Sequence, residues 1–205
     1  MSQKITGSST ALFSTWWLIE ELGLLFDAGD GLSAGLLSKG RKVKNVFISH
    51  ADRDHVCGLL QFNQLNARPG LRIFYPKDCS TFPYLEEFTK KFDPHTGGTQ
   101  WIPVEPEQEI EIKKDIFVRM IRNNHIPAPS HVVKSFSFIV ERKKRKLKEE
   151  FLGLPGHEIA SLKQQLGDSM TYETREKILG YSGDTPVEQF PLWPGTYNGS
   201  FEQWD

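Results

Sequence analysis

Residues 49–55 read Ser-His-Ala-Asp-Arg-Asp-His and contain four side chains that can bind a metal: His50, Asp52, Asp54 and His55. Imidazole and carboxylate ligands suit zinc, manganese or iron. Four potential ligands so close in the chain are too many for one ion on geometric grounds, so the run indicates a two-metal site. The alternative interpretation is a polar loop whose carboxylates cap the next helix.

The metal-binding run directly follows Val46-Phe47-Ile48, a β-branched and aromatic stretch that predicts the end of a strand. A strand that ends in a tight polar loop lets ligands converge from rigid backbone. The elements predicted elsewhere are strands at 13–20, 24–26, 71–75, 101–104, 109–122, 134–141 and 177–181, and helices at 32–39, 54–66, 80–92 and 157–166. Because strands and helices are mixed, with antiparallel meanders, we expect layers of sheet flanked by helices.

The length and composition indicate which classes of protein this chain can belong to. A chain of 205 residues with 38% hydrophobic and 12% aromatic residues fits one globular domain with a sizeable core. A net charge of −1 argues against a general nucleic-acid binder, although a local basic stripe remains compatible with it. Cys57 and Cys79 lack a framework spacing and indicate reduced thiols, hence a cytoplasmic protein. Two adjacent glutamates interrupt the apolar stretch 11–26, so we expect no membrane span.

Four motifs in the expected order resemble the ribonuclease Z branch of the metallo-β-lactamase superfamily. The strand and the ligands at 50–55 resemble that superfamily's metal motif, His-x-[His or Asp]-x-Asp-His. The others are Phe26-Asp-Ala-Gly-Asp-Gly31, His131-Val-Val-Lys-Ser-Phe-Ser-Phe138 and Tyr181-Ser-Gly-Asp-Thr185, and Gly153-Leu-Pro-Gly156 is also similar to a stretch found in that branch. The resemblance spans residues 6–186. It implies an α+β fold, the αββα sandwich, as a single domain over residues 1–205 that lacks its C-terminal strands and helices.

By position, the resemblance assigns two divalent metal ions, zinc first, with manganese or iron as alternatives. It gives the first ion His50, His131 and Asp184, and the second ion Asp54, His55 and Asp184. Asp52 stands where the family most often has a His. A carboxylate there would favour harder metals, or it would lie outside the ligand set.

The same resemblance implies the chemistry. The metals would lower the pKa of a bridging water, and the resulting hydroxide would attack phosphorus or a carbonyl carbon. Asp54 is the expected proton acceptor because it would reach both metal and water. Asp27 is expected to support the ligands by hydrogen bonding or by packing its loop.

Two further sets of residues have alternative interpretations. Spacing to Ser135-Phe136 favours His131 over His125 as the third imidazole, and His125 would then contact substrate or lie on the surface. The basic run contains Arg142, Lys143 and Lys144. Its cations either contact RNA phosphates or belong to a solvated extension of a strand.

The leading functional hypothesis is a metal-dependent phosphodiesterase, an endonuclease similar to ribonuclease Z that acts in tRNA processing on a transfer-RNA precursor. The alternatives are a hydrolase of small esters, thioesters or phosphodiesters, and a degenerate member without catalysis. The family has a further metal-binding His downstream of Ser-Gly-Asp-Thr, but this chain has no His after His157. A truncated form, a weakly held second ion or a ligand from a partner chain would each account for this, and a homodimer is expected.

Overall fold

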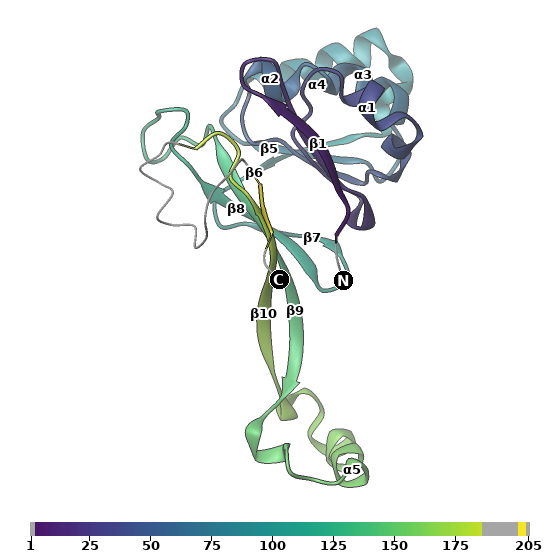
Figure 1. The fold of residues 1–205 in the computed structure, drawn as a ribbon, viewed down its shortest axis with the longest axis vertical. Coiled ribbons are helices and arrows are strands. Elements are labelled where there is room, and N and C mark those ends of the chain that lie inside the picture. The colour runs from purple at the N-terminus through teal and green to yellow at the C-terminus, as the bar shows by residue number, and fades with distance from the viewer. Residues whose placement is uncertain (1–2, 186–200, 204–205) are drawn as a thin grey trace.

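The computed structural model describes residues 3–185 and 201–203, and its centre is two β-sheets packed face to face (Figure 1). The first sheet has the order β1-β2-β3-β4-β5-β6. Its strands are β1 (Ile5–Thr10), β2 (Ser14–Ile19), β3 (Leu24–Phe26), β4 (Asn45–Phe47), β5 (Arg72–Pro76) and β6 (Gln100–Val104). Pairing is antiparallel from β1 to β3 and parallel from β3 to β6. The parallel part needs crossover connections, and these carry the helices.

The second sheet is antiparallel and has the order β11-β10-β9-β8-β7. Its strands are β7 (Glu109–Lys113), β8 (Ile116–Arg122), β9 (Phe136–Leu147), β10 (Thr171–Tyr181) and β11 (Phe201–Gln203). Aromatic rings join the sheets: Phe26 of the first sheet stacks on Phe138 and Tyr181 of the second, with ring centroids 5.3 and 5.0 Å away. Burial of such rings is the main cohesive force between the layers.

The helices cover the other face of the first sheet. They are α1 (Leu32–Leu36), α2 (Arg53–Val56), α3 (Leu59–Asn66) and α4 (Thr81–Phe92), joined by short 3₁₀ turns that include η2 (Leu37–Lys42). Leu36, Phe62 and Phe82 from these helices pack against the buried Val46 and Ile48. In the described part of the chain, no helix is long and apolar enough to cross a bilayer. Both cysteines are free; Cys57 is exposed and Cys79 is buried.

A long two-stranded arm, residues 142–177, extends from the body of the molecule and carries α5 (Gly156–Leu166) at its far end (Figure 1). The sequence predicted α5, but it predicted strands only over 134–141 and 177–181. The strands of the arm lack a continuous buried face, so no apolar alternation marks them. Within the residues described, α5 is the only α-helix after the first sheet, so no helix covers the outer face of the second sheet.

Two other predicted elements are divided in the structure. The helix expected at 54–66 is interrupted at Gly58, whose N–H donates to the carbonyl of Ala28 at 2.8 Å. A Cβ on Gly58 would lie 2.1 Å from the carbonyl oxygen of Gly29, so only glycine allows this close approach. The strand expected at 109–122 is the hairpin of β7 and β8, which turns through Asp115 in the left-handed region (φ 61°).

Candidate metal centre

The potential ligands gather at one edge of the sandwich, where β4, β8 and β10 end. The metal-motif run leaves β4 and continues into α2, which brings His50 and His55 side by side with ring centroids 4.1 Å apart. His125 comes from the loop after β8, and its ring centroid lies 4.6 Å from that of His50. Asp184 follows the end of β10. Three segments far apart in sequence therefore deliver donors to one place.

Two sets of three donors lie close enough to share an ion. The ligand atoms of His50, Asp52 and His125 all lie within 4.8 Å of one another, and so do those of His50, His55 and Asp184. His50 belongs to both sets, but its single free ring nitrogen can coordinate only one ion. One ion would therefore take His50, and a second would need a further donor beside His55.

Asp184 and Asp54 supply the remaining donors. One carboxylate oxygen of Asp184 lies 3.4 Å from Nε2 of His55, and the other lies 3.7 Å from Nε2 of His125. Asp184 therefore belongs to the second set and also lies close to His125 of the first set. Asp54 belongs to neither set, but its Oδ2 lies 3.7 Å from Nε2 of His55. It stands at the rim of the second set.

The imidazole nitrogens that face the site are the observation that points to a metal. Among the described residues, the Nε2 atoms of His50, His55 and His125 are buried and have no hydrogen-bond partner. Buried polar atoms without a partner are rare and call for an explanation such as a bound ion. Nitrogen and carboxylate oxygen donors with no thiolate fit zinc, and also manganese or iron. The residues present therefore fit a divalent metal.

A buried carboxylate supports the donors from behind. Asp27 directly follows β3, has its backbone in the left-handed region (φ 55°), and its N–H donates to the carbonyl of Phe47 at 2.9 Å. Its side chain accepts hydrogen bonds from the N–H of Ser49 (2.7 Å), the hydroxyl of Ser49 (2.8 Å), Nδ1 of His55 (2.7 Å) and the hydroxyl of Tyr181. Asp27 therefore contacts His55 directly and also contacts Ser49, the residue before His50.

The electrostatics of the two buried histidines differ. Burial lowers the pKa of His50, and the neighbouring His55 lowers it further. Burial also disfavours the charged form of His55, but the carboxylates of Asp27 and Asp184 outweigh it and raise the pKa of His55 to about 10. The ion pair with His55 lowers the pKa of Asp184. Without a metal, His55 therefore carries the proton that a metal would displace from Nε2.

The structure places His125 at the site, whereas the spacing argument favoured His131. His131 is exposed and contributes to neither donor set. The intervening loop folds back because Arg122 donates to the carbonyls of Ala128 (3.0 Å) and Pro129 (2.9 Å). Among the described residues, His125 therefore lies with the other donors and His131 does not.

Asn123 holds this loop and was not singled out from the sequence. It is buried, its Oδ1 accepts the N–H of His125 at 3.2 Å, and its amide donates to the carbonyl of Ser182 at 3.2 Å. It therefore joins the loop of His125 to the segment that carries Asp184. The only signal in the sequence was a pair of asparagines directly after a predicted strand.

The basic residues predicted to contact substrate lie on the arm, in cross-strand ion pairs. Lys144 is 2.7 Å from a carboxylate oxygen of Glu176, and Arg142 is 3.5 Å from the same atom. Lys143 is 3.8 Å from Glu173. These cations are therefore partly neutralised by the opposite strand.

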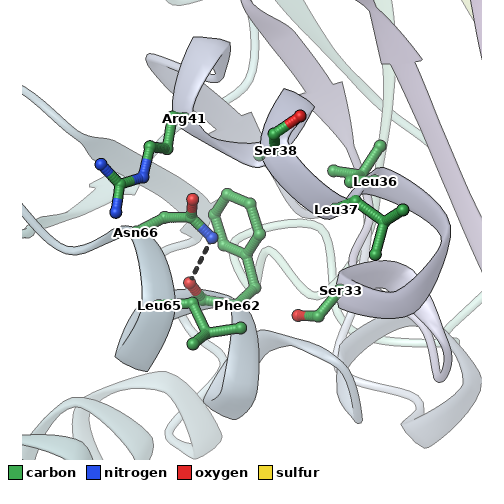
Figure 2. A pocket seen from close by; sticks show the side chains of 9 residues that line it. Ser33, Leu36, Leu37, Ser38, Arg41, Phe62, Leu65 and Asn66 are labelled. Carbon is green, nitrogen blue, oxygen red and sulfur yellow. Dashed lines mark hydrogen bonds between the residues drawn. The ribbon is translucent and has the colours of Figure 1, made fainter.

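A separate hollow of about 250 Å³ lies between α1, η2 and α3 (Figure 2). Phe62 lines it, with its carbonyl bonded to the amide of Asn66 at 2.9 Å. Arg41 is the only ionisable side chain among the described residues that line it. Because it lacks converging ligands, we place the chemistry at the imidazole cluster instead.

The chain matches one known protein family and is similar to several known proteins. Residues 24–148, more than half of the chain, match the model of the family described as the beta-lactamase superfamily domain. A nuclear ribonuclease Z of Triticum aestivum is 36% identical over 129 residues, covering 58% of this chain and 66% of that protein. A ribonuclease Z of Ignicoccus hospitalis is 30% identical over 205 residues, covering 87% of this chain and 64% of that protein.

Among solved structures, the short form of human tRNase Z is similar with a TM-score of 0.41 and 18% sequence identity, covering 67% of this chain and 56% of that one. The chain spans no more than about two thirds of the length of these relatives. The family match includes β3, β4 and the potential ligands at 50–55, which lie between β4 and α3. The chain therefore belongs to the metallo-β-lactamase superfamily, and its distant homologues are ribonuclease Z proteins.

Proposed function

We propose that this chain is a metal-dependent hydrolase that cleaves phosphodiester bonds in RNA. The observation that carries the proposal is the convergence of three buried imidazole nitrogens, none with a hydrogen-bond partner, on the carboxylates of Asp52 and Asp184. The names of the relatives, ribonuclease Z and tRNase Z, support RNA as the substrate class and a transfer-RNA precursor as the first one to test.

We assign the donors to two ions on the distances already given. One ion would be held by His50, Asp52, His125 and Asp184, and the other by Asp54, His55 and Asp184. Zinc is the first candidate, and the carboxylate of Asp52 makes manganese or iron the alternatives. When bound, such a pair supplies a water of lowered pKa and positive charge close to the phosphate oxygens.

The side chains of the site would accept a proton, fix the spacing of the ligands and orient a histidine ring. Asp54 is half-buried at the rim of the second set and can accept the proton of the attacking water. Asp184, with one oxygen toward each set, keeps the two sets in fixed relation. Asp27 holds the ring of His55 from the protein interior, so His55 needs little reorganisation.

The charges on the arm are consistent with a large, anionic substrate. Residues 142–148 contain six lysines and arginines and no acidic residue. Among the described residues, Lys146 and Lys148 have no ion-pair partner, so their charges are available to phosphates. A projecting arm of this kind could contact RNA at a distance from the metal centre (Figure 1).

The test compares the purified chain with its His50→Ala variant, each supplied with zinc or manganese, on a transfer-RNA precursor. We expect cleavage by the unaltered chain and none by the variant, with His131→Ala as a matched control that keeps its activity. Equal rates for the chain and the His50→Ala variant would overturn the proposal.

A second candidate is a hydrolase of small esters, thioesters or phosphodiesters. The ion pairs on the arm favour it, because Glu176 and Glu173 already neutralise Arg142, Lys143 and Lys144 in part. A panel of small esters, measured beside the RNA, separates the two candidates. A chain that binds no metal tightly would instead be the degenerate, non-catalytic member.

A further inference from the structure

The hydroxyl of Ser49 lies between the buried carboxylate and the first histidine of the metal motif. Its Oγ is 2.8 Å from Oδ2 of Asp27 and 2.9 Å from Nδ1 of His50. Ser49, Asp27 and His50 are all 0% exposed, so no solvent competes for these contacts. The hydroxyl therefore has short contacts with Asp27 and His50, a longer one of 3.4 Å with Nδ1 of His55, and a single proton to donate.

The chemistry of the two neighbours determines where that proton goes. An ionised carboxylate can only accept, so the proton of Ser49 points to Asp27. The oxygen of Ser49 must then accept a hydrogen bond from His50, which requires the proton of the neutral imidazole to sit on Nδ1. Its Nε2 is then left as a lone pair, and this is the atom that faces the site.

We propose that Ser49 is a positioning residue that sets the tautomer and ring orientation of His50 by relaying the hydrogen-bonding capacity of Asp27. His55 receives the same control directly, because its Nδ1 lies 2.7 Å from Oδ2 of Asp27. A single buried carboxylate thereby prepares two imidazoles for one metal centre, one of them by direct contact and the other through a hydroxyl. The proposal rests on the proposed function only in taking His50 as a ligand.

Tyr181 supplies a matched control within the same network. Its hydroxyl also donates to Asp27, whereas the hydroxyl that contacts Nδ1 of His50 is that of Ser49. Tyr181→Phe therefore removes one donor from the carboxylate and leaves the bridge through Ser49 intact. Ser49→Ala removes the bridge itself.

The first measurement is nitrogen-15 NMR of the histidine rings in metal-free protein at neutral pH, where no catalysis is needed. We expect His50 to carry its proton on Nδ1 in the unaltered chain and in Tyr181→Phe. In Ser49→Ala we expect the proton to redistribute to Nε2, with His55 unchanged. A His50 signal that is the same in Ser49→Ala, or that changes equally in Tyr181→Phe, would overturn the proposal.

The second measurement is zinc affinity. Loss of a group that orients a histidine ligand typically weakens metal binding by about 10- to 100-fold, so Ser49→Ala should fall in that range. Ser49→Thr keeps the hydroxyl and should restore affinity. Circular dichroism checks folding, and the Ala and Phe variants decide the matter even if the threonine is not accommodated. Failure of RNA cleavage with these NMR results intact would count against the proposed function alone.

Discussion

The metal centre and the arm are both rich in ionisable residues, yet the fold treats those residues in opposite ways. On the arm, Lys144 and Glu176 pair across neighbouring strands at 2.7 Å, with side chains that are 44% and 43% exposed. At the metal centre, imidazole nitrogens are buried without a hydrogen-bond partner beside carboxylates that are only 3.4 to 3.7 Å away. A run of ionisable residues therefore indicates a metal site only where the fold buries several donor atoms without hydrogen-bond partners and brings them close together.

The largest expected effect is on metal binding. His50→Ala removes the donor that belongs to both ligand sets, so we expect zinc affinity to fall by more than about 100-fold. Arg145→Ala on the arm breaks an ion pair with Asp168 and should leave zinc affinity unchanged. Competition with a coloured chelator measures both. Equal affinities would remove the distinction between the two regions.

The sequence contained enough information to predict the cluster at residues 50–55, but less to choose the third imidazole. The potential ligands at 50–55 follow a short buried strand, so local pattern and position were sufficient to predict that they lie close together. The choice between His125 and His131 depends on a loop whose path is set by Arg122 and Asn123 through contacts that no spacing rule encodes. Asn123 and Ser49 act through side chains buried against distant segments, which a local pattern does not reveal.

For the fold as well, elements with a clear local pattern were predicted, and features that depend on distant contacts were missed. The strands and helices of the first sheet alternate in a pattern of buried and polar residues that the sequence displays. The break at Gly58 was missed because it arises from the carbonyl of Gly29, which belongs to another segment. The length of the arm was missed because its strands are solvated, which leaves no apolar alternation to detect.

The second expected effect is on stability. Asp27→Asn keeps the shape of the side chain but replaces an acceptor of four hydrogen bonds by an amide that cannot accept them all. We expect a loss of about 3 kcal/mol in the free energy of unfolding, the scale for a buried charged network that loses its partner. Urea denaturation of metal-free protein measures it. A midpoint equal to that of the unaltered chain would show that the network contributes nothing.

A pH effect follows from the same network. Because the pKa of His55 rises from 6.5 to about 10 on folding, the folded state holds a proton that the unfolded state has released above pH 6.5. This contribution to stability is fully present below about pH 6.5 and is lost as the pH approaches about 10. Thermal melts of metal-free protein across that range should show the decline, and His55→Gln should reduce it. A decline that persists unchanged in His55→Gln would assign it to other groups.

The smallest effect is expected on the arm. Lys146→Ala should weaken RNA binding and reduce the slope of log affinity against log salt by about 1, because one phosphate contact is lost. Lys144→Ala, whose charge is engaged by Glu176, should change the slope less. Fluorescence anisotropy with a transfer-RNA precursor at several salt concentrations compares the two. A larger effect from Lys144→Ala would show that pairing does not withhold a charge from RNA.

The most direct test of the metal centre is anomalous diffraction from a crystal of the chain soaked in zinc. We predict two anomalous peaks about 4 Å apart, as in other two-metal sites, with Asp184 between them and His125 rather than His131 in contact with one. Absence of a peak among His50, His55 and Asp184, with their side chains turned apart, would contradict the account.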